Sequence, residues 1–590
     1  MKKNTICLFF ASILLFCLES KISFAQNIIF VTQTGGGSQS GASWANAKSG
    51  ADLPGILSTA SGNQIWIAEG IYTPSVNNDR SARFKINHGC KVYGGFAGTE
   101  TQLSQRDSSL TIHKTILSGE IQNDNTDTNN TYNIVQINEV NKAVYLNSLI
   151  VEKANDTPSQ QALDIGGLNL QHATVYLNNM GILSNKGAGI YIQGANVYIN
   201  NSKIHDNDNY RGSLGGGIMI ESDVFVHPPH QNYVAIENTA IHDNYAIGGG
   251  GLYFRFLTPT DTLIMEKCKI NNNTAGVMGG AGLWITGGND STSSVVLNKV
   301  EMKGNSSQVW NDGGEGLNMN GGNLFVNDAV IAENYNGGGS SGGSGYGGGV
   351  FLQLVHKARF VNCTFANNSS DTTPGLVGYD ADQIFIESPN VKFENCIFKS
   401  SKGNTHHNFG PPQSDPYYFH DVSFANCLFD GDFPVLWTDS GNNITNTDPY
   451  LTGQYELSQN SPAIDAGNNS FRNVNYSDDL AGNPRIINGI VDLGATEFQE
   501  NEGGNANGVA ELAAKEVIVY PNPFTERIII KSAKVGSVFY LYNISGQAVL
   551  QGTIKKPVQE IDLSRLANGA YLLNLTSTDN RNIVLKCVKQ

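Results

Sequence analysis

Residues Val234–Phe254 read VAIENTAIHDNYAIGGGGLYF, and this stretch decides the fold. It contains two short runs in which apolar residues alternate with other residues, an Asn-rich bend between them, and a block of glycines that leads into a third alternating run. Alternation with a period of two predicts β-strands, and Asn and Gly tolerate the left-handed backbone of tight bends. The stretch is therefore a strand–bend–strand–glycine–strand unit.

Copies of this unit recur through most of the chain, every 22 to 37 residues. The first strand of each copy opens at Val175, Val197, Val234, Leu263, Val295, Leu324, Ala358, Val391 and Val422. The bend after it falls at Asn179, Asn201, Asn238, Lys267, Lys299, Asp328, Asn362, Asn395 and Asn426. A second Asn follows the second strand, at Asn185, Asn207, Asn244, Asn273, Asn305, Asn334 and Asn368.

Short strands with no helical stretch between them do not build βαβ units. A β-propeller is the competing repeat fold, but its blades need hairpin turns and four strands in about 40 residues. The repeat instead predicts an all-β protein with a parallel β-helix, in which each coil adds two or three strands to sheets that run along the stack. Equivalent residues of successive coils then lie about 4.8 Å apart, and stacked Asn amides can bond to one another.

The cysteines follow the same repeat. Beyond residue 25 there are six, with no CxxC pair and no metal-ligand spacing, at Cys90, Cys268, Cys363, Cys396, Cys427 and Cys587. The third, fourth and fifth occupy one inward position of consecutive coils, which predicts a buried column. We expect free thiols there, with a disulfide between neighbouring coils as the alternative.

Composition limits the function. The net charge of −15 argues against a nucleic-acid partner and fits an extracellular protein. Lys2 and Lys3, an apolar core over residues 6–18 and a small-residue site ending at Ala25 predict a secretory signal peptide over residues 1–25. No later stretch is apolar enough to predict a transmembrane helix.

The chain before the regular copies, residues 27–117, is expected to cap the stack and to form its first coils, because an uncapped end exposes core and unpaired backbone. Residues 51–60 are spaced like a short amphipathic helix, and residues 63–74 and 91–100 like strands. The β-helix with this cap is expected over residues 26–498, followed by a polar linker over 499–516.

Residues 517–590 form a separate predicted domain. Seven short alternating strands in about 75 residues predict a small, immunoglobulin-like β-sandwich. Its segments VYPNPF (519–524), LYNISGQAV (541–549), LANGAYLLNL (566–575) and KCVKQ (586–590) are similar to the type A C-terminal sorting domain of the Bacteroidetes type IX secretion system. That resemblance implies contact with the secretion machinery, passage across the outer membrane, and attachment to the cell surface or release. Carbohydrate binding by a small sandwich is the alternative, which the PNP opening and the basic end disfavour.

The repeat region also resembles known families. FANN (365–368), GGGI (215–218) and GGGL (249–252) are similar to the repeats of chlamydial polymorphic outer-membrane proteins. Five further segments resemble the choice-of-anchor Q group of surface proteins: SWANA (43–47), QIWIAEGIYTP (64–74), YGGFAGTE (93–100), SPAIDAG (461–467) and DLAGNPRIINGIVDLGATEF (479–498). Over residues 28–498 the resemblance implies a pectate-lyase-like right-handed β-helix, and the group has no single assigned activity.

The strand that follows the glycines carries the candidate binding residues. Its aliphatic positions are expected to point inward, so the residue between each pair points outward. Five of these seven outward residues are aromatic and form the candidate ligand site: Tyr191, Tyr253, Trp284, Phe351 and Phe385. An exposed aromatic column fits a polysaccharide laid along the coils, because sugar rings present flat C–H faces. Cover by an inter-coil loop is the alternative.

The next outward position and one repeated turn offer weaker signals. The position holds Glu221, Arg255, Thr286, Asn320, Gln353 and Glu387. β-Helix polysaccharide lyases use calcium on clustered acidic residues together with a basic residue, but no acidic cluster accompanies the arginine here. His-Asp-Asn occurs twice in register, at 205–207 and 242–244, where a divalent-metal site competes with a simple solvated turn.

The function predicted from these observations is a secreted or outer-membrane surface β-helix protein that binds glycans or proteins without catalysis. A carbohydrate-active β-helix enzyme, either a polysaccharide lyase or a glycoside hydrolase, is the second hypothesis, and a purely architectural rod the third. No catalytic residue, metal site or cofactor is assigned, with calcium the one cofactor left open.

Overall fold

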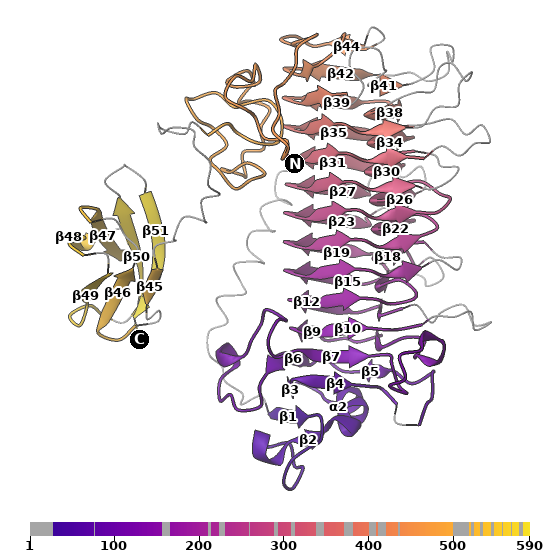
Figure 1. Cartoon of the computed structure of the whole chain (residues 1–590), viewed down its shortest axis with the longest axis vertical. Helices are drawn as coiled ribbons and strands as arrows, with labels where there is room; N and C mark the ends of the chain where they lie inside the picture. The colour runs from indigo at the N-terminus through magenta and orange to yellow at the C-terminus, as the bar shows by residue number, and fades with distance from the viewer. Residues whose placement is uncertain are drawn as a thin grey trace. The chain divides into compact units, whose positions relative to one another are not determined.

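In the computed structural model each copy of the repeat forms one coil, and equivalent strands of successive coils pair in parallel (Figure 1). The structure describes residues 27–499 except 76, 156–165, 210–213, 224–229, 259, 288–292, 308–312, 338–346, 371–381, 401–408, 411–420 and 435–436. It also describes residues 518–589 except 521–523, 532–534, 544–547, 557, 568 and 577–581. The chain divides into two compact units, Met1–Glu500 and Asn501–Gln590. The expected signal peptide, and all but the first residue of the expected linker, lie outside the described residues.

Three long parallel sheets and one short sheet form the first unit. In spatial order, sheet A contains β2 (Lys48–Ser49), β1 (Ile28–Thr32), β3 (Gln64–Ala68), β6 (Lys91–Phe96), β9 (Val144–Asn147), β12 (Thr174–Asn178), β15 (Asn196–Asn200), β19 (Tyr233–Glu237), β23 (Thr262–Glu266), β27 (Ser294–Asn298), β31 (Asn323–Asn327), β35 (Lys357–Val361), β39 (Val391–Glu394), β42 (Val422–Ala425) and β44 (Thr438–Asp439). Sheet B contains β4 (Gly70–Tyr72), β7 (Thr115–Ser118), β10 (Ile150–Glu152), β13 (Gly181–Leu183), β16 (Lys203–His205), β20 (Ala240–His242), β24 (Lys269–Asn271), β28 (Glu301–Lys303), β32 (Val330–Ala332), β36 (Thr364–Ala366), β40 (Ile397–Lys399) and β43 (Leu428–Phe429).

The glycine-led strands form sheet C: β5 (Phe84–Ile86), β8 (Val135–Asn138), β11 (Leu168–Gln171), β14 (Ile190–Gln193), β18 (Ile218–Glu221), β22 (Leu252–Phe256), β26 (Leu283–Gly287), β30 (Leu317–Asn320), β34 (Val350–Gln353), β38 (Ile384–Glu387) and β41 (Phe409–Gly410). Sheet D lies between sheets B and C along each coil and contains β17 (Asp208–Asn209), β21 (Tyr245–Ala246), β25 (Thr274–Ala275), β29 (Ser306–Ser307), β33 (Tyr335–Asn336) and β37 (Ser369–Ser370). The predicted parallel β-helix is confirmed.

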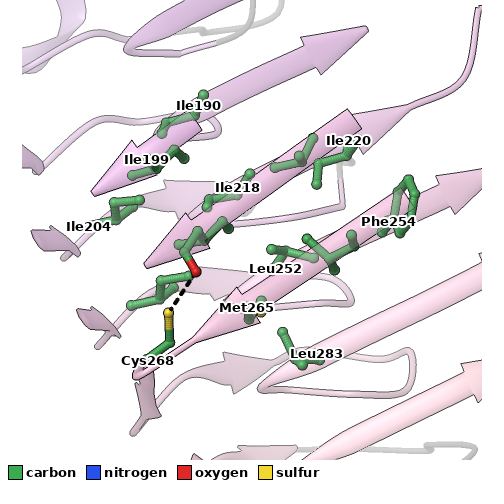
Figure 2. Packing of buried hydrophobic residues seen from close by; sticks show 14 of the residues in the cluster. Ile190, Ile199, Ile204, Ile218, Ile220, Leu252, Phe254, Met265, Cys268 and Leu283 are labelled. Carbon is green, nitrogen blue, oxygen red and sulfur yellow. Dashed lines mark hydrogen bonds between the residues drawn. The ribbon is translucent and has the colours of Figure 1, made fainter. Parts of the chain in front are cut away.

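The register of the strands matches the repeat. Val234 pairs with Val197 of the preceding coil and with Leu263 of the next one. The other predicted strand openings pair in the same column. The inward aliphatic side chains of sheets A, B and C fill one continuous core, part of which Figure 2 shows. Burial of this column is the main favourable contribution to folding.

The bends behave as predicted. All nine bend residues have φ between 48° and 55°, the left-handed region that Asn tolerates best. The second Asn forms a buried ladder. The Nδ2 of Asn273 donates to the Oδ1 of Asn305 (3.0 Å) and to the Ile241 carbonyl (2.9 Å), and its own Oδ1 accepts from Asn244 (3.0 Å). The same side-chain bond joins every neighbouring pair from Asn185 to Asn368.

The six described cysteines are buried free thiols, as expected. Cys363, Cys396 and Cys427 stack in consecutive coils, and the Sγ of each contacts a carbonyl of the coil before it, at 3.5 to 3.7 Å. Figure 2 shows the same arrangement at Cys268, whose Sγ lies 3.4 Å from the Ile236 carbonyl. Burial raises the pKa of the Cys268 thiol to about 12, so this thiol is protonated and unreactive at neutral pH.

The N-terminal segment packs against the first strands of the stack, and its role as a cap stays a prediction. The helix α2 (Leu53–Thr59) begins with a proline in its first turn and buries Leu53 and Leu57 in the main core beside β5. Four 3₁₀ helices complete the irregular part: η2 (Trp44–Asn46), η3 (Gly50–Asp52), η4 (Leu103–Gln105) and η5 (Asp127–Asn129). The helix predicted over residues 51–60 is present, and so are strands within 63–74 and 91–100.

Residues 446–498, here called the strap, fold back along the bends between sheets A and B (Figure 1). The ammonium of Lys299, which is 1% exposed, lies 2.6 Å from Asp478 Oδ2. The guanidinium of Arg485, which is 2% exposed, lies with its Nε 3.4 Å from Asp328 Oδ1. These ion pairs with the strap explain Lys299 and Asp328 at two bends, where most coils have Asn.

The second unit consists of two antiparallel sheets. One contains β45 (Ile518–Tyr520), β46 (Arg527–Lys531) and β49 (Val558–Asp562), and the other β48 (Ala548–Thr553), β47 (Val538–Asn543), β50 (Gly569–Thr576) and β51 (Asn582–Lys589). Side chains from both sheets, among them Ile528, Ile530, Leu541 and Leu573, share one hydrophobic core. The seven predicted strands are present among the described residues, and the immunoglobulin-like topology stays a prediction.

Candidate functional site on the outer face of sheet C

The aromatic column is in register but is largely buried, in contrast to the exposed column expected from the sequence. Tyr191 is 1% exposed, Tyr253 and Phe351 are each 5% exposed, and Phe385 is not exposed at all. Only Trp284 is half-buried. Rings of neighbouring coils contact one another, with centroids 5.1 Å apart for Tyr253 and Trp284. The geometry therefore favours structural cover over a ligand platform at these positions.

The glycine block supplies the cover. In several coils a glycine of this block has a positive φ, 64° at Gly249 and 71° at Gly314, which turns the chain back over the outer face of the sheet. A Cβ at Gly249 would lie 2.9 Å from the Cβ of Tyr253, and one at Gly314 would lie 2.8 Å from the Cβ of Phe351. The glycines are needed because the backbone passes directly over the aromatic residue.

The polar ends of the two tyrosines reach the neighbouring column. Tyr191 donates to Glu221 Oε2 (3.2 Å), and the Tyr253 hydroxyl lies 3.3 Å from Thr286 Oγ1. Burial raises the pKa of both phenols, and at Tyr191 the carboxylate of Glu221 adds to the rise. Both tyrosines therefore stay neutral at physiological pH and act as hydrogen-bonding core residues.

Truncation of Tyr253 tests this assignment. Because the ring is buried, Tyr253→Ala is expected to lower the free energy of unfolding by about 3 kcal/mol, measured by urea denaturation. Tyr198→Ala, which removes a half-exposed ring from sheet A, is the matched control and is expected to cost about 1 kcal/mol or less. Equal effects of the two substitutions would contradict the buried role.

The next position of each coil forms the accessible part of sheet C, here called the polar row. Its members pair in register: Gln171, Gln193, Glu221, Arg255, Thr286, Asn320, Gln353 and Glu387. Arg255 is exposed and the others are half-buried. Asn320 Nδ2 donates to Gln353 Oε1 (2.6 Å), and Gln353 Nε2 donates to Glu387 Oε2 (2.7 Å). The row is a continuous line of amide, carboxylate, hydroxyl and guanidinium groups.

A histidine–aspartate pair lies beside one end of the row. His172 directly follows Gln171, and its Nε2 lies 2.6 Å from Asp223 Oδ2. The ring of His230 packs edge-on against that of His172, with centroids 4.6 Å apart. Asp223 is 4% exposed and orients the imidazole, which is the arrangement by which a carboxylate prepares a histidine for proton transfer.

The repeated His-Asp-Asn turn shows a different geometry. His205 and His242 stack with centroids 4.8 Å apart, and the Nδ1 of each lies 2.6 Å from the following aspartate of its own coil. Both aspartates have positive φ and are turn residues. Among the described residues, no group of three or more His, Cys, Asp and Glu side chains is placed to hold a metal ion.

A second aromatic column lies on sheet A and was missed by the sequence analysis. The rings of Tyr145, Tyr176 and Tyr198 stack 4.7 Å apart, with interplanar angles of 6° and 8°. The sequence contains a signal for this column: VYLN occurs at 144–147 and 175–178, and VYIN at 197–200. Because the rings stack face to face, only their edges and hydroxyls reach solvent, so this column offers no flat platform for sugars.

Comparison with known proteins assigns the C-terminal unit. Residues 518–590 match the model of the secretion system C-terminal sorting domain. This is a sorting domain. It indicates export by the type IX secretion system, contact with its machinery, and a location at the cell surface or outside the cell. In the described part of the chain, no helix has the length and apolar character needed to cross a membrane.

The β-helix unit is less closely related to known proteins. No curated protein matches the chain. One similar solved structure is a mannuronic acid specific polysaccharide family 6 lyase enzyme from human gut microbiota, with 10% identity over 64% of this chain and 85% of the other. Its TM-score is 0.25, so we draw no functional inference from it. The resemblance of residues 28–498 to the choice-of-anchor Q group stays a prediction.

Proposed function

We propose that this chain is a type IX-exported surface or secreted protein that binds a polysaccharide along the polar row of sheet C without turning it over. The polar row carries the proposal. It places hydrogen-bonding groups on eight successive coils, about 4.8 Å apart, so a linear chain of hydroxyl groups meets a linear series of donors and acceptors. Half-buried side chains already held by neighbours lose little conformational entropy when a ligand binds.

The charge of the chain limits the classes of polysaccharide that the polar row can bind. The net charge of −15 and the carboxylates of Glu221 and Glu387 in the row disfavour a polyanionic glycan, because like charges repel at this spacing. A neutral or sparsely charged polysaccharide fits the row better. The aromatic residues of sheet C lie on the same outer face but are buried, so they do not touch the ligand in this proposal.

A binding screen with row variants tests the proposal. The purified protein is titrated with neutral glycans, pectin, alginate and glycosaminoglycans, with and without calcium. Gln353→Ala combined with Glu387→Ala is expected to weaken binding of the preferred glycan at least tenfold, which corresponds to about 1.4 kcal/mol. Asn200→Ala with Glu237→Ala removes a matched amide and carboxylate from adjacent coils of sheet A and is expected to leave binding unchanged.

Catalysis is the second candidate function, and the pair of His172 and Asp223 is the observation that favours it. A glycan on the polar row would end beside this pair, where an oriented imidazole can act as an acid or a base. The same screen, followed by assays for new reducing ends and for unsaturated products, separates the two functions. Turnover that is lost in His172→Ala would replace the binding proposal with an enzymatic one.

A further inference from the structure

The corner after β7 contains an insertion that no other feature of the fold explains. Between Ser118 and Thr131 the chain leaves the β-helix, forms η5, and returns to lead into β8. Its backbone is tied to the coils at both ends: Thr131 N donates to the Gly119 carbonyl (2.9 Å), and Asn155 N donates to the Thr131 carbonyl (2.8 Å). The side chains at this corner come from two successive coils: Glu120 to Thr131 follow β7, and Asn155 follows β10.

Five buried side-chain oxygens at this corner accept no hydrogen bond from the described residues. They are Glu120 Oε1, Asn129 Oδ1, Asn130 Oδ1, Thr131 Oγ1 and Asn155 Oδ1, and one donor nitrogen, Asn130 Nδ2, is unpaired beside them. Glu120 is 7% exposed, Asn155 is 2% exposed, and Asn130 and Thr131 are not exposed. Burying such an oxygen without a partner is unfavourable, most of all for a carboxylate. The excess of five unpaired acceptors over one unpaired donor at this corner favours a missing electropositive partner.

The side-chain amides of Asn155 and Asn129 are each oriented by a hydrogen bond that their nitrogen donates. Asn155 Nδ2 donates to the Asp127 carbonyl (2.5 Å), and Asn129 Nδ2 donates to Asp124 Oδ2 (2.7 Å). Their oxygens are therefore the atoms left without a partner. At the opposite end of the loop, a Cβ placed on Gly119 would lie 3.0 Å from Thr131 Oγ1, so the hydroxyl sits directly beside the residue that precedes Glu120.

The chemistry of these atoms defines the ligand. The unpaired acceptors are one carboxylate oxygen, three amide oxygens and one hydroxyl, which suit a hard cation, while Asn130 Nδ2 is a donor and would not be a ligand. Calcium accepts such mixed, irregular sets of six to eight oxygens, whereas magnesium requires a near-ideal octahedron and keeps its waters. We propose that this corner is a calcium site formed by Glu120, Asn129, Asn130, Thr131 and Asn155.

The surrounding charges limit its affinity. The guanidinium of Arg80 donates to the backbone carbonyls of Asn130 (2.7 Å) and Asn155 (3.1 Å) and lies over the ring of Tyr132. It satisfies main-chain oxygens and leaves the side-chain oxygens to the cation, but its charge opposes tight binding. Because the site has a single carboxylate, we expect it to bind calcium as weakly as extracellular modules do, with a Kd of about 10⁻⁴–10⁻³ M.

The site is tested on the full-length protein after treatment with a chelator. Calcium at about ten times the Kd is expected to raise the Tm of the β-helix unit by about 1–3 °C, and magnesium to have a smaller effect. Terbium bound at the corner is expected to luminesce through Tyr132 and to be displaced by calcium. Glu120→Gln is expected to lose both responses, whereas Glu139→Gln, which changes an exposed carboxylate of the same coil, keeps both.

The Tm without calcium shows whether Glu120→Gln has lost calcium binding or has lost its fold. Because Glu120→Gln removes an unpaired buried charge, its Tm without calcium is expected to equal or exceed that of the unaltered protein. Failure of the unaltered protein to respond to calcium would overturn the proposal and leave ordered water as the partner of these oxygens. A calcium response retained in Glu120→Gln would also overturn it, since the ion would then bind elsewhere.

Discussion

Deletion of residues 518–590 is expected to leave nearly all of the protein in the periplasm. These residues form a folded unit with their own core, separate from the core of the β-helix, so their loss removes the sorting signal and leaves the β-helix intact. The measurement is fractionation of cells followed by detection of the protein in periplasm, outer surface and medium. An unchanged Tm for the truncated protein confirms that only sorting was removed.

A single substitution tests whether export depends on the folded state of this unit. Lys589 is 7% exposed, and its ammonium donates to the carbonyls of Leu563 (2.7 Å), Ser564 (2.9 Å) and Leu566 (2.8 Å), which ties the last strand to a turn. Lys589→Ala is expected to unfold this unit in part and to reduce export, because hydrogen bonds to a charged group contribute about 1.5–3 kcal/mol each. Lys555→Ala, at an exposed lysine, is the control. Normal surface delivery of the truncated protein would contradict the sorting role.

Arg485→Met is expected to destabilise the β-helix unit by about 3–5 kcal/mol. The guanidinium of Arg485 neutralises Asp328 and donates to the Gly494 carbonyl. Burial raises the pKa of Asp328, and Arg485 and Lys299 oppose that rise. Without Arg485, the carboxylate of Asp328 is left buried beside a strap that no longer compensates its charge. Urea denaturation measures the loss, and proteolysis within residues 446–498 reports the release of the strap.

Two further variants isolate the ion pair from the general effect of losing an arginine. Arg359→Met removes a partly exposed arginine that pairs with Glu394 and donates to the Phe471 carbonyl of the strap (3.1 Å), and it is expected to cost about 1 kcal/mol or less. Arg485→Met combined with Asp328→Asn is expected to recover part of the lost stability, because the uncompensated charge is gone. Equal destabilisation by Arg485→Met and Arg359→Met would show that the strap does not depend on this buried pair.

Most of the fold was predictable because the same short sequence pattern recurs in every coil of the β-helix. The strand openings from Val175 to Val422, the left-handed bends and the ladder of buried Asn amides all follow from a period-two pattern with Asn and Gly at set positions. The strap was not predictable. Its sequence has no periodicity, and its partners lie up to about two hundred residues earlier, as at Tyr476 and Glu266. Lys299 and Asp328, at a bend position that most coils fill with Asn, were a visible sign of it.

The sequence by itself determined which residues share a column, because register in a parallel stack is a property of spacing alone. It placed Tyr191, Tyr253, Trp284, Phe351 and Phe385 in one line, and that line exists. Only the tertiary structure decided that the line is buried. A residue that points away from the core of one coil is exposed only if no other backbone crosses it. Glycines of the same or the preceding coil pass over this line, as at Gly249 over Tyr253 and Gly314 over Phe351. The accessible face of sheet C is therefore the polar row, one position further along the same strands.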